Sequence, residues 1–357
     1  MNATPVTQVR PLMLDCSPAN SGAATRVSGA SLASRLLPAR RRSLFTMQGW
    51  HVWCGTAVEG PDGRFYLLFS RWPQSAGHDG WVTHSEIAVA VSDSPEGPYV
   101  YQSVVLAGAG GDAWDAHVTH NPTVLRYRGK YYLYYMGNHG NGEYWNNRNN
   151  QRVGLAVADH PMGPWRRSPG PVLDVTPDSW DCLMVSNPSV CIGPGGGLCM
   201  IYKGVGAGQM PKGGDVVCGA AFADRPEGPW RKHPSPVIRN PDHPWAVEDP
   251  FIWSQDGRYY CIVKDFQGYF SGGERNVLVL MESEDAINWL PTAEPLFMRR
   301  QIYWEGGICE PVEALERPQL MFGADGTATL LLAGAFDSKR ERSFNLQLSL
   351  GAGGGGV

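Results

Sequence analysis

The stretch NPTVLRYRGKYYLYY, residues 121–135, decides the fold because its pattern returns along the chain. A polar residue and a proline lead into a short strand-like run, a glycine turn and an aromatic run. Further copies are NPSVCIGPGGGLCMIY (187–202), DPFIWSQDGRYYCIV (249–263), RPQLMFGADGTATLLL (317–332) and a degenerate GTAVEGPDGRFYLLF (55–69). The copies therefore recur with a period of about 65 residues.

A second motif accompanies the first and gives each repeat its length. It reads SPEGPY (94–99), HPMGPW (160–165) and RPEGPW (225–230), each after another strand-like run. All these runs are short and rich in β-branched and aromatic residues, which favours strands over helices. Five repeats of three or four strands predict an all-β chain, a five-bladed β-propeller over residues 46–350. We expect residues 1–45 to be a short N-terminal extension, partly disordered or a homodimer arm, and 351–357 to be a disordered tail.

Composition excludes several classes of protein. The 357 residues carry a net charge of −4, and 18% are charged, so a disordered chain and a nucleic-acid-binding protein are not expected. No apolar run approaches the ~18 residues of a membrane helix, and no secretory signal is visible. The eight cysteines form no C-x-x-C pair, and we expect five to be buried thiols, which favours a reducing, cytoplasmic location: Cys54, Cys191, Cys199, Cys218 and Cys261.

Polar residues gather where the inner strands of the predicted propeller begin, and these strand heads converge on one mouth of the channel. Paired carboxylates beside aromatic side chains are what acid/base cleavage of a glycosidic bond requires. The candidate catalytic residues are Glu248, Asp249, Asp115, Asp181 and His51. The candidate substrate-binding residues are Trp53, Arg71, Trp72, His84, Glu86, His117, His120, Asn121, Asn187, Lys203, Lys264, Asp265, Glu316 and Arg317.

Structural roles compete with these assignments. Asp115 and Asp181 each lie six residues before an Asn-Pro pair, so they fit loop braces as well as catalytic groups. Lys203 and Lys264 fit salt bridges between blades. A hydrogen-bonded role for His117 and His120 is favoured over metal binding, because the candidate ligands are separated in the sequence.

The same segments resemble five-bladed propeller glycoside hydrolases of families 43 and 117. The resemblance rests on WHVWCG (50–55), THSEI (83–87), THNPT (119–123), VEDP (247–250) and LERPQL (315–320), and it extends over about 46–340. Family 43 implies that Glu248 is the general acid and that the reaction inverts the anomeric centre. Its base and its third carboxylate fall at Gly55 and Asn187, so this chain departs from the family at two of three positions.

Family 117 implies a pair of Asp residues with a His as acid, which directs attention to His51, His117 and His120. Family 130 phosphorylases also carry Glu-Asp-Pro, but an Arg follows there and Phe251 follows here.

The sequence thus predicts a glycosidase that removes a terminal sugar from an oligosaccharide or polysaccharide fragment. A glycan-binding propeller without catalysis and a glycoside phosphorylase stay open as alternatives. The expected partner is the oligosaccharide. No cofactor is required for this chemistry, and a structural calcium ion in the channel stays open.

Overall fold

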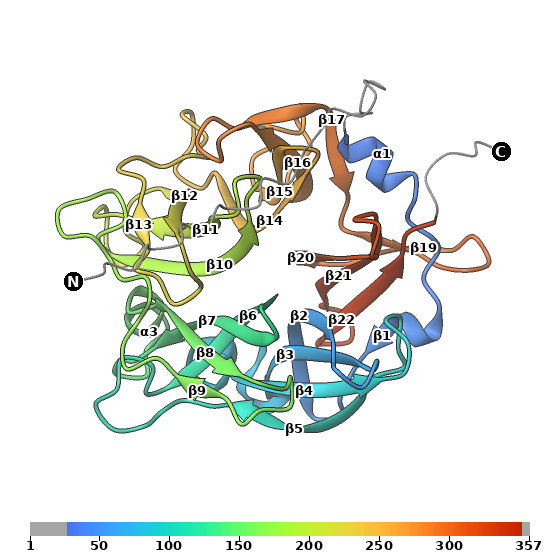
Figure 1. Cartoon of the computed structure of the whole chain (residues 1–357), viewed down its shortest axis with the longest axis horizontal. Helices are drawn as coiled ribbons and strands as arrows, with labels where there is room; N and C mark the ends of the chain where they lie inside the picture. Colours follow the sequence, from blue (N-terminus) through green and yellow to red (C-terminus); the bar gives the residue numbers. More distant parts are fainter. Residues whose placement is uncertain (1–26, 352–357) are drawn as a thin grey trace, which may run out of the picture.

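The computed structural model describes residues 27–351, and in this range the chain forms five four-stranded antiparallel sheets around a central axis (Figure 1). The first sheet contains β2 (Trp50–Glu59), β3 (Phe65–Pro73), β4 (Glu86–Ser92) and β5 (Val100–Leu106). The second contains β6 (Val118–Tyr127), β7 (Lys130–Asn138), β8 (Arg152–Ala158) and β9 (Arg166–Arg167). The third contains β10 (Met184–Ile192), β11 (Leu198–Val205), β12 (Val216–Ala223) and β13 (Arg231–Lys232).

The fourth sheet contains β14 (Val247–Gln255), β15 (Arg258–Asp265), β16 (Val277–Ser283) and β17 (Leu290–Met298). The fifth contains β20 (Ala314–Phe322), β21 (Ala328–Asp337), β22 (Arg342–Ser349) and β1 (Leu44–Phe45). A hairpin of β18 (Gln301–Tyr303) and β19 (Cys309–Pro311) precedes it. The inner strands β2, β6, β10, β14 and β20 contact one another in turn and return to β2. The predicted five-bladed propeller is therefore confirmed.

The N-terminal segment closes the ring of blades. β1 pairs with β22, with Leu44 opposite Leu346, so the fifth sheet takes its outermost strand from the start of the described chain. The helix α1 (Gly29–Ala33) packs against β17, and Leu32 is part of the core of blades four and five. In the described residues, β1 is thus part of the fifth sheet and α1 packs on the fourth, while the predicted boundary of the propeller at residue 46 stays a prediction. The expectations for residues 1–26 and 352–357 lie outside the described residues, and the homodimer stays a prediction.

Each inner strand carries one β-bulge at the same place. Two residues oppose one on the neighbouring strand, and the first of the two has a positive φ of 50° to 57°. These five residues are Cys54, Asn121, Asn187, Asp249 and Arg317. Proline follows four of them and Gly55 follows Cys54, so proline stands inside a bulge and not at a strand start. The bulges also correct the repeat register by one residue, since Cys54 and not Gly55 is equivalent to Asn121.

Short insertions between strands cover the mouth of the channel in blades one and two. The 3-10 helices η2 (Gln74–Ala76) and η3 (His78–Gly80) and the helix α2 (Trp81–His84) join β3 to β4. The helix α3 (Tyr144–Asn149) lies between β7 and β8, and η1 (Arg41–Ser43) precedes β1. Within residues 27–351, no helix has the length and apolar character needed to cross a membrane. The five cysteines expected to be buried thiols are buried and free.

Candidate active site at the channel mouth

A ring of five side chains closes the channel at the level of the bulges. The Cys54 thiol donates to Asn121 Oδ1 at 2.8 Å, Asn121 Nδ2 donates to Asn187 Oδ1 at 2.7 Å, and Asn187 Nδ2 donates to Asp249 Oδ1 at 2.5 Å. Arg317 Nη1 lies 3.8 Å from Asp249 Oδ1, and Arg317 Nη2 donates to the backbone carbonyl oxygen of Asn121 at 3.4 Å. We call these five residues the bulge ring. Because all five are at most 7% exposed, the ring separates the two ends of the channel.

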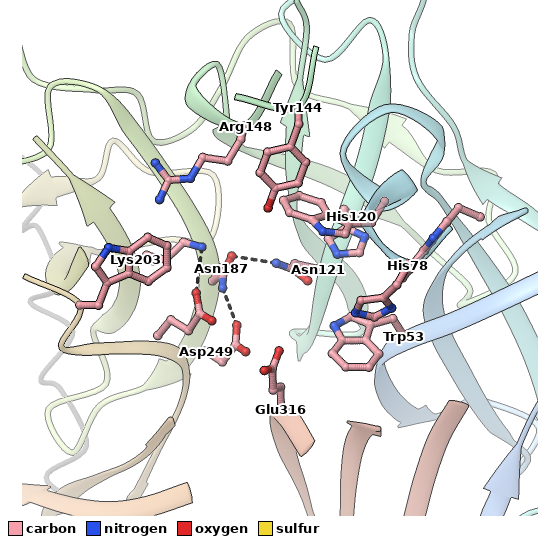
Figure 2. A pocket seen from close by; sticks show the side chains of 14 residues that line it. Trp53, His78, His120, Asn121, Tyr144, Arg148, Asn187, Lys203, Asp249 and Glu316 are labelled. Carbon is pink, nitrogen blue, oxygen red and sulfur yellow. Dashed lines mark hydrogen bonds and ion pairs between the residues drawn. The ribbon is translucent and has the colours of Figure 1, made fainter. Parts of the chain in front are cut away.

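The two ends differ in chemistry. Beyond the bulge ring lies a cavity of about 370 Å³ with many apolar lining residues, among them Phe251, Trp253 and Leu320. On the side of the strand heads lies a cavity of about 180 Å³ with the residues shown in Figure 2. Its lining is Trp53, Trp72, His78, Trp81, His120, Asn121, Tyr144, Arg148, Asn187, Lys203, Trp245, Glu248, Asp249 and Glu316. We call it the mouth cavity.

Three carboxyl groups form the floor of the mouth cavity. Glu248, Asp249 and Glu316 each place an oxygen within 4.8 Å of the others. Two lysines from second strands reach them: Lys203 Nζ is 3.2 Å from Glu248 Oε2, and Lys264 lies between Glu316 and Glu248. The bulges bring these groups together, because Glu248 and Glu316 occupy the same position in blades four and five, directly before the bulged residue.

The two adjacent acids in this cluster are driven to opposite protonation states. Burial raises the pKa of Asp249, the neighbouring charge of Glu248 raises it further, and the result is a pKa of about 7. Burial alone would also raise the pKa of Glu248, but Lys203 and Lys264 hold it at about 2. One carboxyl is therefore held ionised beside another that keeps its proton near neutral pH, which is the arrangement that separates acid and base roles.

The walls of the cavity are aromatic. Trp53 and Trp72 come from blade one, Trp81 from the first insertion, and Trp245 from the segment before β14. The ring of His120 stacks on Trp81 with centroids 5.1 Å apart, and Ser85 Oγ lies 2.7 Å from His120 Nδ1. Burial lowers the pKa of His120 well below its ordinary value, so this histidine is a neutral hydrogen-bonding group.

Asp115 and Asp181 lie away from the mouth cavity and brace their blades in the same way. Asp115 accepts hydrogen bonds from Tyr135 Oη at 2.9 Å and from Arg167. Asp181 has the matching partners, Tyr202 Oη at 3.0 Å and a lysine of β13, Lys232, at 2.6 Å. The tryptophan before each aspartate stacks on the same tyrosine with centroids 5.9 Å apart. The structure thus removes both from the candidate catalytic set and gives them the bracing role.

His51 also leaves the candidate catalytic set. Its Nδ1 lies 2.8 Å from Ser343 Oγ, and its ring stacks on Trp72 behind the cavity lining. Burial and the neighbouring His78 lower its pKa to about 4. A buried neutral imidazole with a hydroxyl partner has a packing role.

Several predicted substrate-binding residues also lie elsewhere. Arg71 pairs with Glu86 at 2.8 Å and sits over the rings of Trp50 and Tyr101. Asp265 accepts hydrogen bonds from the backbone N–H groups of residues 267–271 and holds that loop. His84 is exposed beside Thr83, and exposed His117 contacts Asn147. Neither histidine lines the mouth cavity.

The cavity also contains residues that the sequence did not single out as site residues: His78, Trp81, Tyr144, Arg148 and Trp245. All of them except Trp245 lie in the insertions 74–84 and 139–150. The connections between the second and third strands have similar lengths in blades one to four, so the available signal was the aromatic and basic content of these two connections. Trp245 has a sequence signal of its own, because a tryptophan also stands shortly before the Asn-Pro pairs of blades two and three, as Trp114 and Trp180.

The donor set on the floor suits an internal ion-pair network better than a divalent cation. Calcium takes six to eight oxygen ligands, and here two of the three carboxylates already have lysine partners. Glu248, Asp249 and Glu316 are the residues that would hold a cation, and they could do so only if Lys264 moved away from them.

The fold is shared with solved glycoside hydrolases. A family 117 glycoside hydrolase of Zobellia galactanivorans superposes with a TM-score of 0.62 at 17% identity, over 88% of this chain and 89% of that chain. An endo-arabinase of Bacteroides thetaiotaomicron gives 0.59 at 15% identity, over 86% and 96%. An arabinanase of Bacillus subtilis gives 0.56 at 14% identity, over 84% and 93%. No family model and no curated protein sequence matches the chain. At these identities the likeness establishes the five-bladed fold.

Proposed function

We propose that this protein is a glycoside hydrolase whose chemistry takes place on the floor of the mouth cavity. The observation that carries the proposal is the adjacent pair Glu248 and Asp249 on the cavity floor. Asp249 is buried and Glu248 is half-buried, an oxygen of each lies within 4.8 Å of the other, and their surroundings set the pKa of Glu248 to about 2 and that of Asp249 to about 7. Glycosidic cleavage needs one carboxyl that donates a proton to the leaving oxygen and one ionised carboxylate. The shared fold with family 43 and 117 hydrolases supports the same assignment.

In this proposal Asp249 donates the proton and Glu248 acts as the ionised partner. Asp249 Oδ1 accepts a hydrogen bond from Asn187 Nδ2, so Oδ2 is the oxygen that carries the proton to be donated. Glu248 is held in place by Lys203 and Lys264. The tryptophan walls supply flat apolar faces against which a sugar ring can stack. This assignment differs from the family 43 resemblance, in which Glu248 is the acid.

The spacing of the floor carboxyls bears on the stereochemistry. Oxygens of Glu248 and Asp249 lie within 4.8 Å, which is nearer to the ~5 Å of retaining enzymes than to the ~6.5–9.5 Å of inverting ones. We therefore expect retention, where the family 43 resemblance implies inversion. Proton NMR of the first-formed anomer distinguishes the two outcomes.

A panel of oligosaccharides and aryl glycosides tests the proposal. We expect release of a terminal sugar by the wild-type chain without added phosphate, and loss of release in Asp249→Asn. Turnover that depends on inorganic phosphate would establish the phosphorylase instead. Asp181→Asn is the control, because it removes a buried, cation-paired aspartate outside the cavity.

A glycan-binding propeller without turnover is the second candidate. The observation that favours it is that Asp249 is hydrogen-bonded within the bulge ring and is only 3% exposed, which limits its access to a substrate. Sugar binding with no bond cleavage across the panel would select this reading.

A further inference from the structure

Arg148 is a buried guanidinium in the wall of the mouth cavity. It belongs to the short helix α3, is 4% exposed, and lies above the carboxyl floor (Figure 2). Burying a charge is costly unless an opposite charge or several hydrogen bonds compensate for it. The partners of this side chain therefore indicate whether its charge is compensated within the protein.

The hydrogen-bond partners of Arg148 are neutral and use one nitrogen, and Glu248, the acid whose charge acts on Arg148, lies beyond ion-pair distance. Nη1 donates to Asn149 Oδ1 at 3.0 Å and to the carbonyl oxygen of Lys212 at 3.0 Å. Among residues 27–351, Nε and Nη2 have no hydrogen-bond acceptor, and no carboxylate lies within 4.0 Å of the group. The hydrogen bond from Nη1 to the Lys212 carbonyl oxygen thus orients the guanidinium, and Nε and Nη2 stay available to a ligand.

The other buried cations behave differently. Four further lysines and arginines in the described chain are buried. Three have a carboxylate partner: Arg71 with Glu86, Lys203 with Glu248, and Lys264 with Glu316. Arg317 lies 3.8 Å from Asp249, belongs to the bulge ring and does not line the mouth cavity. Among the described buried cations that line this cavity, Arg148 is the one without a carboxylate within 4.0 Å.

The pairing of charges around the cavity points the same way. Arg148 and Lys203 line the cavity together with Glu248, Asp249 and Glu316, and Lys264 contacts the acids without lining the cavity. Lys203 and Lys264 are paired with Glu248 and Glu316, whereas Arg148 has no carboxylate within 4.0 Å among the described residues. His78 and His120 add no positive charge, because burial lowers the pKa of both. A bound anionic group would pair with Arg148.

Tyr144 adds a neutral donor on the same side of the cavity. It precedes Arg148 by four residues on α3, and residues at this spacing share a helix face. Burial, together with the nearby Asp79, raises the pKa of its hydroxyl to about 12, so the phenol keeps its proton. In Figure 2 the hydroxyl points into the cavity. Trp245, with its ring centroid 6.0 Å from Arg148 Cζ, provides a flat face beside the guanidinium.

We propose that Arg148 and Tyr144 bind an anionic substituent, a carboxylate or a sulfate ester, on the sugar that occupies the mouth cavity. The planar guanidinium fork matches both groups in bidentate geometry. The substrate class is then an acidic glycan rather than a neutral one. This inference rests on the proposed function only in placing the sugar in this cavity.

Titration calorimetry on the full-length wild-type chain tests the inference without turnover. The probes are D-glucuronate, D-galacturonate and galactose 6-sulfate against glucose and galactose. We expect at least one acidic sugar to bind about 10- to 100-fold more tightly than its neutral parent, the gain of a charge-assisted contact in a buried site. Comparison of uronates with the sulfate ester identifies the anionic group.

Three variants locate the effect. Arg148→Gln should remove the preference while leaving binding of the neutral sugars within about twofold. Arg148→Lys should keep part of it, because the charge remains and the fork is lost. Arg71→Gln removes a buried guanidinium outside the cavity and should leave the preference unchanged. If Arg148→Gln does not fold, Tyr144→Phe serves instead, with a loss of about 3- to 10-fold for the acidic sugar only.

Several results would overturn the inference. They are equal binding of acidic and neutral sugars, failure of every acidic sugar to bind, or an unchanged preference in Arg148→Gln. Tight binding of inorganic phosphate with phosphate-dependent turnover would also overturn it, since the cation would then serve a co-substrate. Acidic-sugar preference without any hydrolysis would refute the proposed function alone. Hydrolysis of neutral glycosides without preference would refute this inference alone.

Discussion

Two pairs of repeat-equivalent acids occupy this propeller, and they have opposite surroundings. Asp115 and Asp181 each accept hydrogen bonds on Oδ2 from a tyrosine hydroxyl and from a cation of an outer strand. Glu248 and Glu316 precede the bulge in adjacent blades, share Lys264, and line the mouth cavity. The two aspartates therefore share a bracing role, and the two glutamates share a place on the floor of the mouth cavity.

The two pairs differ in how far they lie from the bulge ring, measured along the inner strand of each blade. The aspartates precede the inner strands and meet the outer strands of their own blade. The glutamates stand next to the bulge ring, where five blades converge. Repetition in the sequence therefore shows that two residues have the same role. Only the position of these residues relative to the bulge ring shows whether that role is to brace a blade or to line the cavity.

The largest expected effect concerns turnover at the floor. Asp249→Asn and Glu248→Gln should each lower kcat by about 10²- to 10⁴-fold, since each removes one half of the acid/base pair. Rates are measured per folded molecule, because Glu248→Gln also deprives Lys203 of its carboxylate partner. Turnover within a factor of three of wild type in both variants would remove these acids from the chemistry.

The next effect concerns stability at the brace. Asp181→Asn should lower the free energy of unfolding by about 3 kcal/mol, because it leaves Lys232 without its buried partner. Urea denaturation gives the change, and kcat of the folded fraction should stay within about twofold. A large loss of kcat with unchanged stability would reverse the roles that we assign to the two pairs.

A third effect concerns pH. If Asp249 must be protonated, turnover should fall about tenfold per unit as pH rises above about 7. The raised pKa also means that the folded chain holds a proton that the unfolded chain releases, so this group lowers stability as pH rises from about 4 to 7. Asp249→Asn should flatten this slope. A slope that is the same in both proteins would assign the titration to another group.

The smallest effect concerns the bulge ring. Cys54→Ser keeps a donor for Asn121 Oδ1, so we expect a change of at most about 1 kcal/mol in unfolding free energy. Cys54→Ala leaves the acceptor without its donor and should cost about 1–3 kcal/mol. Equal stabilities of the two variants would show that the thiol contact does not support the ring.

The fold could be predicted because the repeat exposes the strand pattern five times. The register failed by one residue in the first blade, since Gly55 replaces the proline that marks the bulge elsewhere and Cys54 carries no visible signal. Glu248, Asp249 and Glu316 were found because they stand beside the repeated prolines. Tyr144 and Arg148 were missed because they lie on an insertion, and a repeat gives no information about residues outside it.

A crystal structure of Glu248→Gln soaked with an oligosaccharide panel would show which carboxyl reaches the scissile bond. We expect a sugar stacked on the tryptophan walls, with its glycosidic oxygen about 3 Å from the Asp249 carboxyl and its anionic group on Arg148. A sugar bound with no carboxyl within reach of the glycosidic oxygen, or bound at the other end of the channel, would contradict it.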